Sequence, residues 1–408
     1  MQLRIAAHAA AWLTCALTVA PQALCAQAEV SAGGSVFLER GGPLNMTVLV
    51  PEVSADVALT DGLSVNAGWT ADVITGASVA VVDAPTASVD AISGASVQDV
   101  RHVLGGGVRL HDGQSSLAGS YRYGFENDYR SHSFDVTART ELYERNTALE
   151  ITYARSFDRV CDGPDASEAV LKPRLDSSEG CFKDAASTAA AKRRDVGLNV
   201  HTFQGGWTQN LSPDLSMQLT ASAALLDGLQ ANPYRAVVIG RAAAQEHHPD
   251  NRARYAFAAG FRLWIEPLSG ALQPVLRAYR DTWNVRSLSA ELGYEQTLGQ
   301  GLRLRARGRY YVQTGASFFS DDYVLHPTGQ YFTGDRELSP MQSGLLGAQF
   351  SWSVPANEQG EVLGFLGSLE LTLKGDLLKS WFPSFHYDRA AVPNDTALLG
   401  TLSLLAGF

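Results

Sequence analysis

Hydrophobic and polar side chains alternate along the chain from Glu29 to its end, in segments of about ten to fourteen residues separated by turn residues. In the segment 134–142 apolar residues alternate with aspartate, threonine, arginine and glutamate. In the segment 302–310 leucine, alanine and tyrosine alternate with four arginines. Because successive side chains of a strand point to opposite faces, the pattern predicts β-strands with one apolar and one polar face.

The connections between these segments alternate between short and long. The short ones are expected at 61–62, 112–113, 144–145, 211–214, 266–270, 299–301 and 355–360. The long ones are expected at 76–98, 159–194, 228–251, 316–338 and 378–394, with shorter members near Arg40, Asp128 and Trp283. Outer-membrane barrels combine short periplasmic turns with longer extracellular loops. A soluble two-sheet sandwich, with the polar face in solvent, is the competing interpretation.

The pattern therefore predicts an all-β chain that forms a single closed antiparallel transmembrane β-barrel. The segments give about sixteen strands, with about fourteen as the alternative count, and an even number leaves both termini on the periplasmic side. The first two strands are expected at 30–40 and 46–60, and Pro51 interrupts the second. Proline is normally confined to edges or strand ends, so this is the weakest part of the count.

The N-terminus has the pattern of a secretory signal. Arg4 precedes an apolar run over 5–20, and Pro21 and small residues lead to cleavage sites after Ala26 or Ala28. We expect a cleaved signal peptide at 1–26 and an outer-membrane barrel at 27–408. A lipoprotein signal is not favoured, because Leu24 stands directly before Cys25. No later stretch is apolar enough for a membrane-spanning helix.

Charge and cysteine content narrow the function. The formal net charge of -10 argues against a nucleic-acid partner, which would need clustered basic residues. Cys15 and Cys25 lie in the signal, so Cys161 and Cys181 remain as a pair in an oxidising compartment. We expect them to form a disulfide that closes a loop, since their spacing is far from that of a redox Cys-x-x-Cys.

Charged side chains on the polar faces are the candidate lumen-lining residues. Pairing Leu298 with Leu302 around the turn at 299–301 sets Glu295 opposite Arg305 and Glu291 opposite Arg309. A similar pairing sets Arg139 opposite Glu150. The candidates are Arg303, Arg305, Arg307, Arg309, Glu291, Glu295, Arg139 and Glu150. They form either an anion-attracting strip or an ion-paired network that braces the lumen, and the network is the favoured interpretation.

No catalytic or metal site is expected. Glu246, His247, His248 and Asp250 are capable of binding a metal, but adjacent histidines in an extended segment point apart. A barrel phospholipase needs serine and histidine on one strand face, whereas Ser131, His132 and Ser133 are immediate neighbours. A protease of the omptin type remains the remote alternative. Its acidic and histidine side chains would be Asp321, Asp322, His386 and Asp388, in an order that differs from that family.

The end of the chain carries a further indication of the outer membrane. Apolar residues occupy alternate positions from Leu398 to Ala406, and the chain ends at Phe408. This ending resembles the assembly signal of outer-membrane proteins. It implies that the barrel-assembly machinery and outer-membrane lipid are partners.

Several stretches resemble a family of bacterial outer-membrane β-barrel proteins classified as a domain of unknown function. They are DAISGAS at 90–96, GLQANPYR at 228–235, YRDTW at 279–283, RYYVQTGASFF at 309–319 and DRELS at 335–339. The resemblance implies location and fold, but no activity. It also implies a small lipoprotein or a periplasmic flavin- or thiol-linked redox protein as partner. No motif for flavin or haem is present, so no cofactor is expected.

Two functional hypotheses follow for this exported outer-membrane barrel. The first is a non-enzymatic pore or a transport or export component whose polar lumen governs passage. The second is a structural or partner-docking barrel of an envelope complex, which the family resemblance would link to redox proteins. A surface hydrolase is the remote alternative.

Overall fold

The computed structural model describes residues 27–40, 46–76, 98–163, 172, 181, 194–233, 236–239, 242–299, 301–320, 329–387, 390–391 and 394–408. The expected signal peptide at 1–26 lies outside the described residues, and so does most of the expected loop at 76–98. No helix in the described part of the chain is long and apolar enough to span a membrane.

Sixteen long strands form the body of the molecule. They are β1 (Ala28–Arg40), β2 (Met46–Thr60), β3 (Leu63–Gly76), β4 (Gln98–His111), β5 (Ser115–Phe125), β6 (Tyr129–Leu142), β7 (Thr147–Asp162), β8 (Arg194–Ser212), β9 (Leu215–Gly228), β12 (Asn251–Ile265), β13 (Gly270–Asp281), β14 (Arg286–Gly299), β15 (Leu302–Gln313), β16 (Met341–Ser353), β17 (Ser368–Trp381) and β20 (Asn394–Gly407).

These strands follow one another around a closed antiparallel ring, in which β20 pairs with both β17 and β1. Two short hairpins, β10 (Ala236–Ile239) with β11 (Ala242–Gln245) and β18 (His386–Tyr387) with β19 (Ala390–Ala391), lie outside the ring order. The closed barrel of sixteen strands confirms the fold predicted from the alternation, including the first two strands.

Prolines are accommodated by gaps in the hydrogen-bond ladder. Pro51 is paired with Gly34 on β1, but on its other side the β2–β3 register passes from Leu49 to Glu52 without a partner. Pro274 on β13 shows the same one-sided gap toward β12. Because proline has no N–H to donate, each strand loses pairing on one side only and remains in the barrel.

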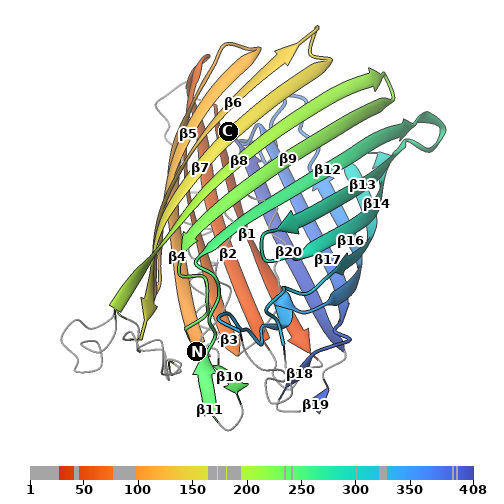
Figure 1. The fold of residues 1–408 in the computed structure, drawn as a ribbon. Helices are drawn as coiled ribbons and strands as arrows, with labels where there is room; N and C mark the ends of the chain where they lie inside the picture. The colour runs from red at the N-terminus through yellow and green to blue at the C-terminus, as the bar shows by residue number, and fades with distance from the viewer. Residues whose placement is uncertain are drawn as a thin grey trace.

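The two ends of the barrel differ, as Figure 1 shows. At one end, here called the turn end, short turns join most of the strands, the longer connection 354–367 joins β16 to β17, and the chain ends at Phe408. At the other, the loop end, lie the long connections and the hairpins β10–β11 and β18–β19. Most connections fall where the sequence pattern places them, but the one between β16 and β17 spans 354–367 and is longer than the expected short turn at 355–360.

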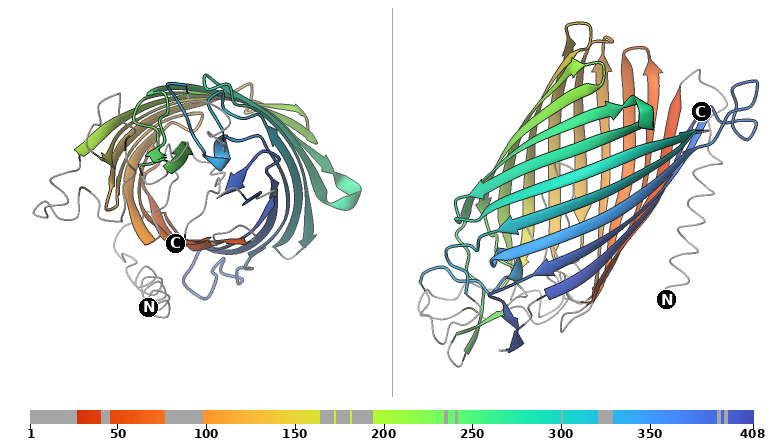
Figure 2. Two further views of the ribbon diagram at one scale, coloured as in Figure 1. Left: turned by 60° about the horizontal axis from the view of Figure 1, so that its bottom comes forward. Right: turned by 90° about the vertical axis from the view of Figure 1, so that its right-hand side faces the viewer.

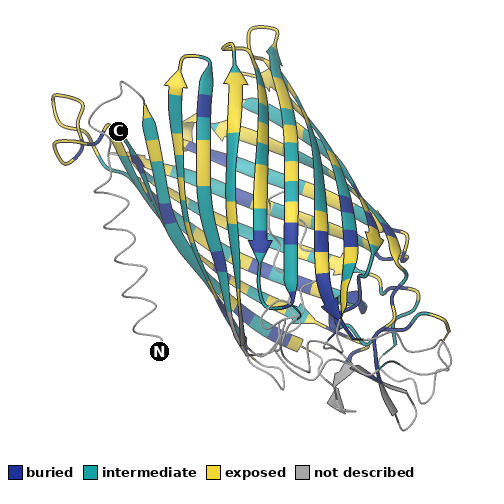
Figure 3. Ribbon diagram, turned by 90° about the vertical axis from the view of Figure 1, so that its left-hand side faces the viewer, coloured by how far each residue is buried: buried dark blue, intermediate teal, exposed yellow. Residues whose placement is uncertain are grey.

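The polar faces of the strands point into the barrel. Arg303 and Arg307 on β15 form ion pairs with Glu370 and Asp376 on β17, across the intervening strand β16. Side chains of β15 and β17 can meet across β16 only on the concave side of the curved sheet, where they converge. The alternate positions that include Arg303 and Arg307 therefore face the inside of the barrel. The opposite parity is apolar, with exposed side chains such as Leu304 and Leu346. Figure 3 shows exposed and partly exposed residues over the outer side, with buried residues gathered toward the loop end.

Candidate functional site: the inner wall and the loop end

One sector of the inner wall, β12 to β15, is strongly basic. Alternation and register place arginines at most of its inward charged positions. They are Arg252, Arg254, Arg262, Arg277, Arg303, Arg305, Arg307 and Arg309. The inward carboxylates of the same strands are Asp281, Glu291 and Glu295. This sector therefore carries an excess of positive charge.

The opposite sector, from β20 through β1 to β3, is acidic. Among the described residues its inward charged positions hold only carboxylates, which are Glu29, Glu39, Glu52, Asp56, Asp72 and Asp395. In the ring order, β12 and β13 stand half a circumference away from β2 and β3. The lumen is thus bounded by a basic wall and an acidic wall that face each other.

The arginines of β15 are held by carboxylates. Arg303 contacts Glu370 at 2.9 Å, and Arg307 contacts Asp376 at 2.9 Å. Glu291 lies 3.9 Å from Arg305 and 3.7 Å from Arg307. Lys374 adds a second cation 3.2 Å from Asp376. The predicted residues Arg303, Arg305, Arg307 and Glu291 thus share a network along β14, β15 and β17 with Glu370, Lys374 and Asp376, which the sequence analysis did not single out.

The predicted register of the β14–β15 hairpin is confirmed, but its carboxylates pair with diagonal neighbours or, for Glu295, with an arginine of β12 across the intervening strand β13. Glu295 lies opposite Arg305 and Glu291 opposite Arg309, as expected. The carboxylate of Glu295 instead binds Arg262 at 3.0 Å. Long side chains reach diagonal neighbours as easily as direct ones, so backbone register does not decide the partner. The expected pairing of Leu298 with Leu302 is wrong, because a bulge pairs Leu302 with Gly299.

The second predicted charge pair lies elsewhere on the inner wall. Arg139 on β6 is directly opposite Glu150 on β7, and their side chains are 3.7 Å apart. Arg139 also contacts Glu141 at 3.2 Å, and Glu141 contacts Arg145 in the following turn at 3.4 Å. All of these side chains are exposed or partly exposed, so each pair contributes little to stability.

Two long connections fold inward over the lumen at the loop end, and we call them the loop-end cap. It consists of the described parts of 229–250, between β9 and β12, and 314–340, between β15 and β16. The left view of Figure 2 shows the green hairpin β10–β11 and the blue turn at Arg336–Leu338 inside the outline of the barrel. Sequence periodicity did not reveal this cap.

Backbone hydrogen bonds join the two halves of the cap. The N–H of His247 donates to the carbonyl of Phe332 at 3.0 Å, and the N–H of Phe332 donates to the carbonyl of His247 at 2.9 Å. Val237, Ala244 and Phe332 form a small buried cluster beside this bridge. The two connections therefore fold as one unit.

An arginine fastens the cap to the barrel wall. Arg336 binds Glu39 on β1 at 2.7 Å and Asp395 on β20 at 3.1 Å. All three side chains are at most 6% exposed. The guanidinium also lies over the ring of Phe382, 4.6 Å from its centroid. Buried charges are stable only when paired, so these ion pairs hold the cap against β1 and β20.

A second buried group supports the cap from β12 and β13. Arg252 lies over the ring of Trp283 at 3.9 Å and binds Asp281, which also accepts a hydrogen bond from Tyr279 at 2.8 Å. His248 packs edge-on against Trp283, at 5.2 Å between centroids. Specific side-chain packing therefore joins the cap to β12 and β13.

Cys161 and Cys181 form a disulfide with a Cα–Cα distance of 5.4 Å. The neighbouring carboxylate of Asp162 is buried, and it accepts hydrogen bonds from Lys172 and from the side chain of Gln245 in the cap. Asp162 thereby links Lys172, in the connection after β7, to Gln245 of the loop-end cap.

Among the described positions considered from sequence, the structure brings no catalytic group together. His132 faces outward, where its Nδ1 atom lies 2.6 Å from the hydroxyl of Tyr121. Ser131 and Ser133 face inward. His247 and His248 point apart, as expected, to Tyr331 and Trp283 respectively. No group of three metal-ligating side chains occurs within the described ranges. Asp321, Asp322 and Asp388 lie outside the described residues, and only the place of His386 in β18 is described.

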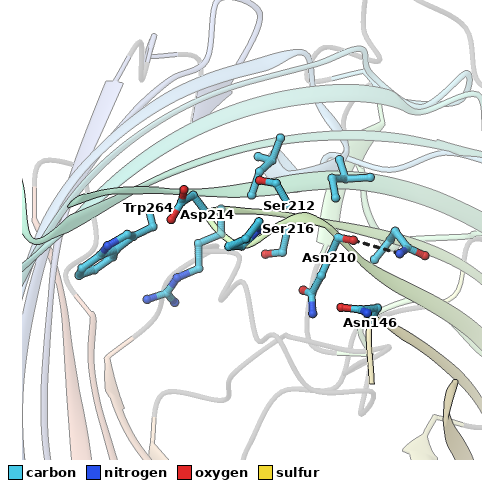
Figure 4. A pocket seen from close by; sticks show the side chains of 11 residues that line it. Asn146, Asn210, Ser212, Asp214, Ser216 and Trp264 are labelled. Carbon is cyan, nitrogen blue, oxygen red and sulfur yellow. Dashed lines mark hydrogen bonds between the residues drawn. The ribbon is translucent and has the colours of Figure 1, made fainter. Parts of the chain in front are cut away.

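A polar cavity of about 580 Å³ lies at the turn end, between the β8–β9 turn and the neighbouring strands. Figure 4 shows Asn146, Asn210, Ser212, Asp214 and Trp264 around it. Backbone hydrogen bonds fix its rim, from Asn210 to Asn146 at 2.8 Å and from Trp264 to Asp214 at 2.7 Å. The cavity offers donors and acceptors but no convergent set of charges.

Comparison with protein families gives one match, to a model described as "Protein of unknown function (DUF3570)", over residues 2–363. The chain belongs to this family. The match spans most of the sequence and agrees with the family resemblance expected from the motifs. A search of curated proteins found no match to this chain.

Solved barrels are similar to this member of the DUF3570 family in overall course only. A bacterial polysaccharide outer membrane secretin has 11% identity and a TM-score of 0.48, with 93% of this chain and 98% of that chain covered. A BenF-like porin from Pseudomonas fluorescens Pf-5 has 9% identity and a TM-score of 0.46, with 94% and 99% covered. Pseudomonas aeruginosa OccK2 (OpdF) in complex with glucuronate has 10% identity and a TM-score of 0.43, with 94% and 98% covered.

Proposed function

We propose that the chain is an outer-membrane channel that passes small solutes with a preference for anions, and that the loop-end cap restricts its outer mouth. An apolar outward face, a polar inward face and alternating short turns and long loops support insertion in the outer membrane. In this orientation the turn end is periplasmic and the loop end extracellular, and residues 1–26 are removed on export.

The observation that carries the proposal is the pair of facing charged walls. A low-dielectric barrel focuses the field between a basic and an acidic wall, so charged solutes entering the lumen are drawn to one side. The arginines of β12 to β15 outnumber the carboxylates on the same strands. The field along this wall therefore favours anions, even though several of its arginines are ion-paired.

Reversal potentials across a planar bilayer test the proposal. The refolded full chain is placed between two concentrations of KCl and compared with the variant Arg277→Gln/Arg305→Gln. Both arginines face inward, and neither is among the most deeply buried side chains. We expect an anion-selective current in the parent and a shift toward cation selectivity in the variant.

The matched control is Arg280→Gln. Arg280 is on the same strand as Arg277, but it faces outward. It should leave the reversal potential unchanged. Equal shifts in both variants would show a general charge effect and would remove the lumen wall as the source of selectivity.

The cap supports a second candidate, a barrel that docks a partner and conducts nothing. The buried ion pairs of Arg336 with Glu39 and Asp395, and the packing around Trp283, hold the cap firmly against the barrel wall. In that case the barrel-assembly machinery, a small lipoprotein or a periplasmic redox protein are the partners we would expect. No conductance from the parent or from a variant with a loosened cap would favour docking over transport.

A further inference from the structure

The charged residues that face away from the lumen are confined to one end of the barrel. Within the described strands they all lie in the loop-end half. The basic ones are Arg40, Arg130, Arg155, Arg159, Arg280, Arg286 and Lys379, and the acidic ones are Asp195 and Asp227. Arg159 and Asp195 pair with each other at 2.8 Å. The outward face of the described strands is thus basic toward the loop end and has no charged residue toward the turn end.

Two of these cations stand directly opposite each other. Arg280 on β13 and Arg286 on β14 are register partners, and both are exposed. Like charges in such positions destabilise a sheet unless an anion lies between them. No carboxylate faces outward from the described residues of β12 to β17. The anion that balances this pair must therefore come from outside the barrel wall.

An apolar groove of about 700 Å³ lies on the outward face of the same strands. Its sides are large side chains, among them Leu276, Leu292, Tyr310 and Leu346. Its base lies at Gly308 and Gly344, where the wall has no side chain. The groove is lined mainly by apolar atoms, which suits a hydrocarbon chain.

Lys379 and Trp381 line the groove at its loop side. Lys379 is exposed and lies in register with Gly344 at the base. A cation beside an apolar groove matches an amphiphile that has an anionic head and acyl chains. An indole at the same level suits the boundary between hydrocarbon and head groups.

We propose that this face binds a phosphorylated, acylated lipid of the outer leaflet. An acyl chain occupies the groove over Gly308 and Gly344, while Lys379 and the Arg280–Arg286 pair bind its phosphates. Arg286 lies four residues toward the loop end from Ala290 in the groove, or about 13 Å along the strand. A lipid with two separated phosphates can therefore engage both cation positions. The inference rests on the membrane orientation of the proposed function, but not on conductance.

Binding is tested with the refolded full chain in detergent, with bisphosphorylated hexa-acyl lipid A as the probe and its dephosphorylated form as comparison. Bound lipid is counted by native mass spectrometry. We expect the phosphorylated probe to bind more tightly by about tenfold, and Lys379→Glu/Arg286→Glu to abolish the difference. Arg145→Glu, which reverses an exposed charge at the turn end, should change nothing.

The groove is tested separately with Gly344→Leu. A Cβ at Gly344 meets only the Trp381 ring, at 3.6 Å, so the strand tolerates it. The control is Gly205→Leu on β8, where nothing lies within 4 Å of the added Cβ. Loss of lipid in the first variant alone is expected. Equal binding of both lipid forms to the parent would overturn the proposal, because the cations would then play no part. If Gly344→Leu changes the oligomeric state without loss of lipid, the proposal is also overturned, and a second copy of the chain occupies the groove.

Discussion

Arg307 and Asp376 meet across a strand that separates them because Gly347 lies between them. Arg307 and Gly347 are register partners on β15 and β16, and Gly347 and Asp376 are partners on β16 and β17. A Cβ on Gly347 would overlap the Oδ1 atom of Asp376 and lie 3.1 Å from the Nε atom of Arg307. Because Gly347 has no side chain, there is room for the carboxylate of Asp376 and the guanidinium of Arg307 to pair.

Gly347→Ala is expected to break this ion pair. The side chain of Asp376 is only 1% exposed, so it would keep Lys374 as its remaining cation while losing Arg307. Leaving a buried carboxylate poorly paired costs about 1–3 kcal/mol. Urea titration of the barrel in lipid vesicles measures the free energy of unfolding.

Gly375→Ala is the control for the glycine substitution. Gly375 lies on β17, with nothing within 4 Å of an added Cβ. Its free energy of unfolding should stay near that of the parent or rise slightly, because alanine restricts the unfolded chain more than glycine does. A loss of the same size in both variants would attribute the effect to glycine itself and not to the ion pair.

Arg336→Met is expected to loosen the loop-end cap. The substitution leaves Glu39 and Asp395 buried without their cation, and removal of one partner of a buried pair costs about 3–5 kcal/mol. The cap should open locally while the ring stays closed. Single-channel recording should show a larger or more frequently open conductance than in the parent.

The triple variant Glu39→Gln/Asp395→Asn/Arg336→Met separates charge from packing. It removes all the buried charges together, and a neutral replacement of a whole buried cluster is often tolerated. The closed conductance should return in part. If the triple variant conducts like Arg336→Met, the guanidinium acts through its stacking on Phe382 and not through its ion pairs.

A covalent lock on the cap should close the channel. His247 and Phe332 exchange two backbone hydrogen bonds, and such antiparallel pairs have Cα atoms about 5.5 Å apart, within reach of a disulfide. In a Cys161→Ser/Cys181→Ser background, His247→Cys/Phe332→Cys should conduct less when oxidised than when reduced. Equal conductance of the oxidised and reduced forms would mean that the position of the cap does not limit the current.

Phe408 is expected to matter more for assembly than for the finished barrel. Its N–H donates to the carbonyl of Ala28 at 2.8 Å, and it packs beside Val362 and Leu366. Phe408→Ala should lower the amount assembled in cells severalfold, yet cost only about 1–2 kcal/mol in the refolded protein. Phe365→Ala, at an exposed neighbouring position, is the control. Equal losses in both assays would reduce Phe408 to a packing residue.

The barrel itself was predictable because its signals are local. A strand with one face in apolar surroundings must alternate, and each turn is marked by its own residues. The β6–β7 and β14–β15 hairpins confirm the predicted opposition of Arg139 with Glu150 and of Glu295 with Arg305. The strand containing Pro51 was in doubt because a one-sided ladder gap leaves no mark in the sequence.

The ion pairs and the cap were not predictable for the opposite reason. Arg303 and Glu370 are separated by an entire strand, and their meeting depends on barrel curvature. Arg336 lies in a polar connection whose residues resemble any surface loop, and only the folded ring shows that its partners are Glu39 and Asp395. Long-range contacts of this kind carry no periodic signature.

The two carboxylates that hold Arg336 stand on the first and the last strand of the ring. Glu39 and Asp395 come together only where β1 and β20 pair, so the binding site for the guanidinium does not exist while that seam is open. A newly made barrel therefore cannot shut its outer mouth before its wall is complete. Once Arg336 is bound, it links β1 to β20 through their side chains, and separating the two strands again would require both of its ion pairs to break.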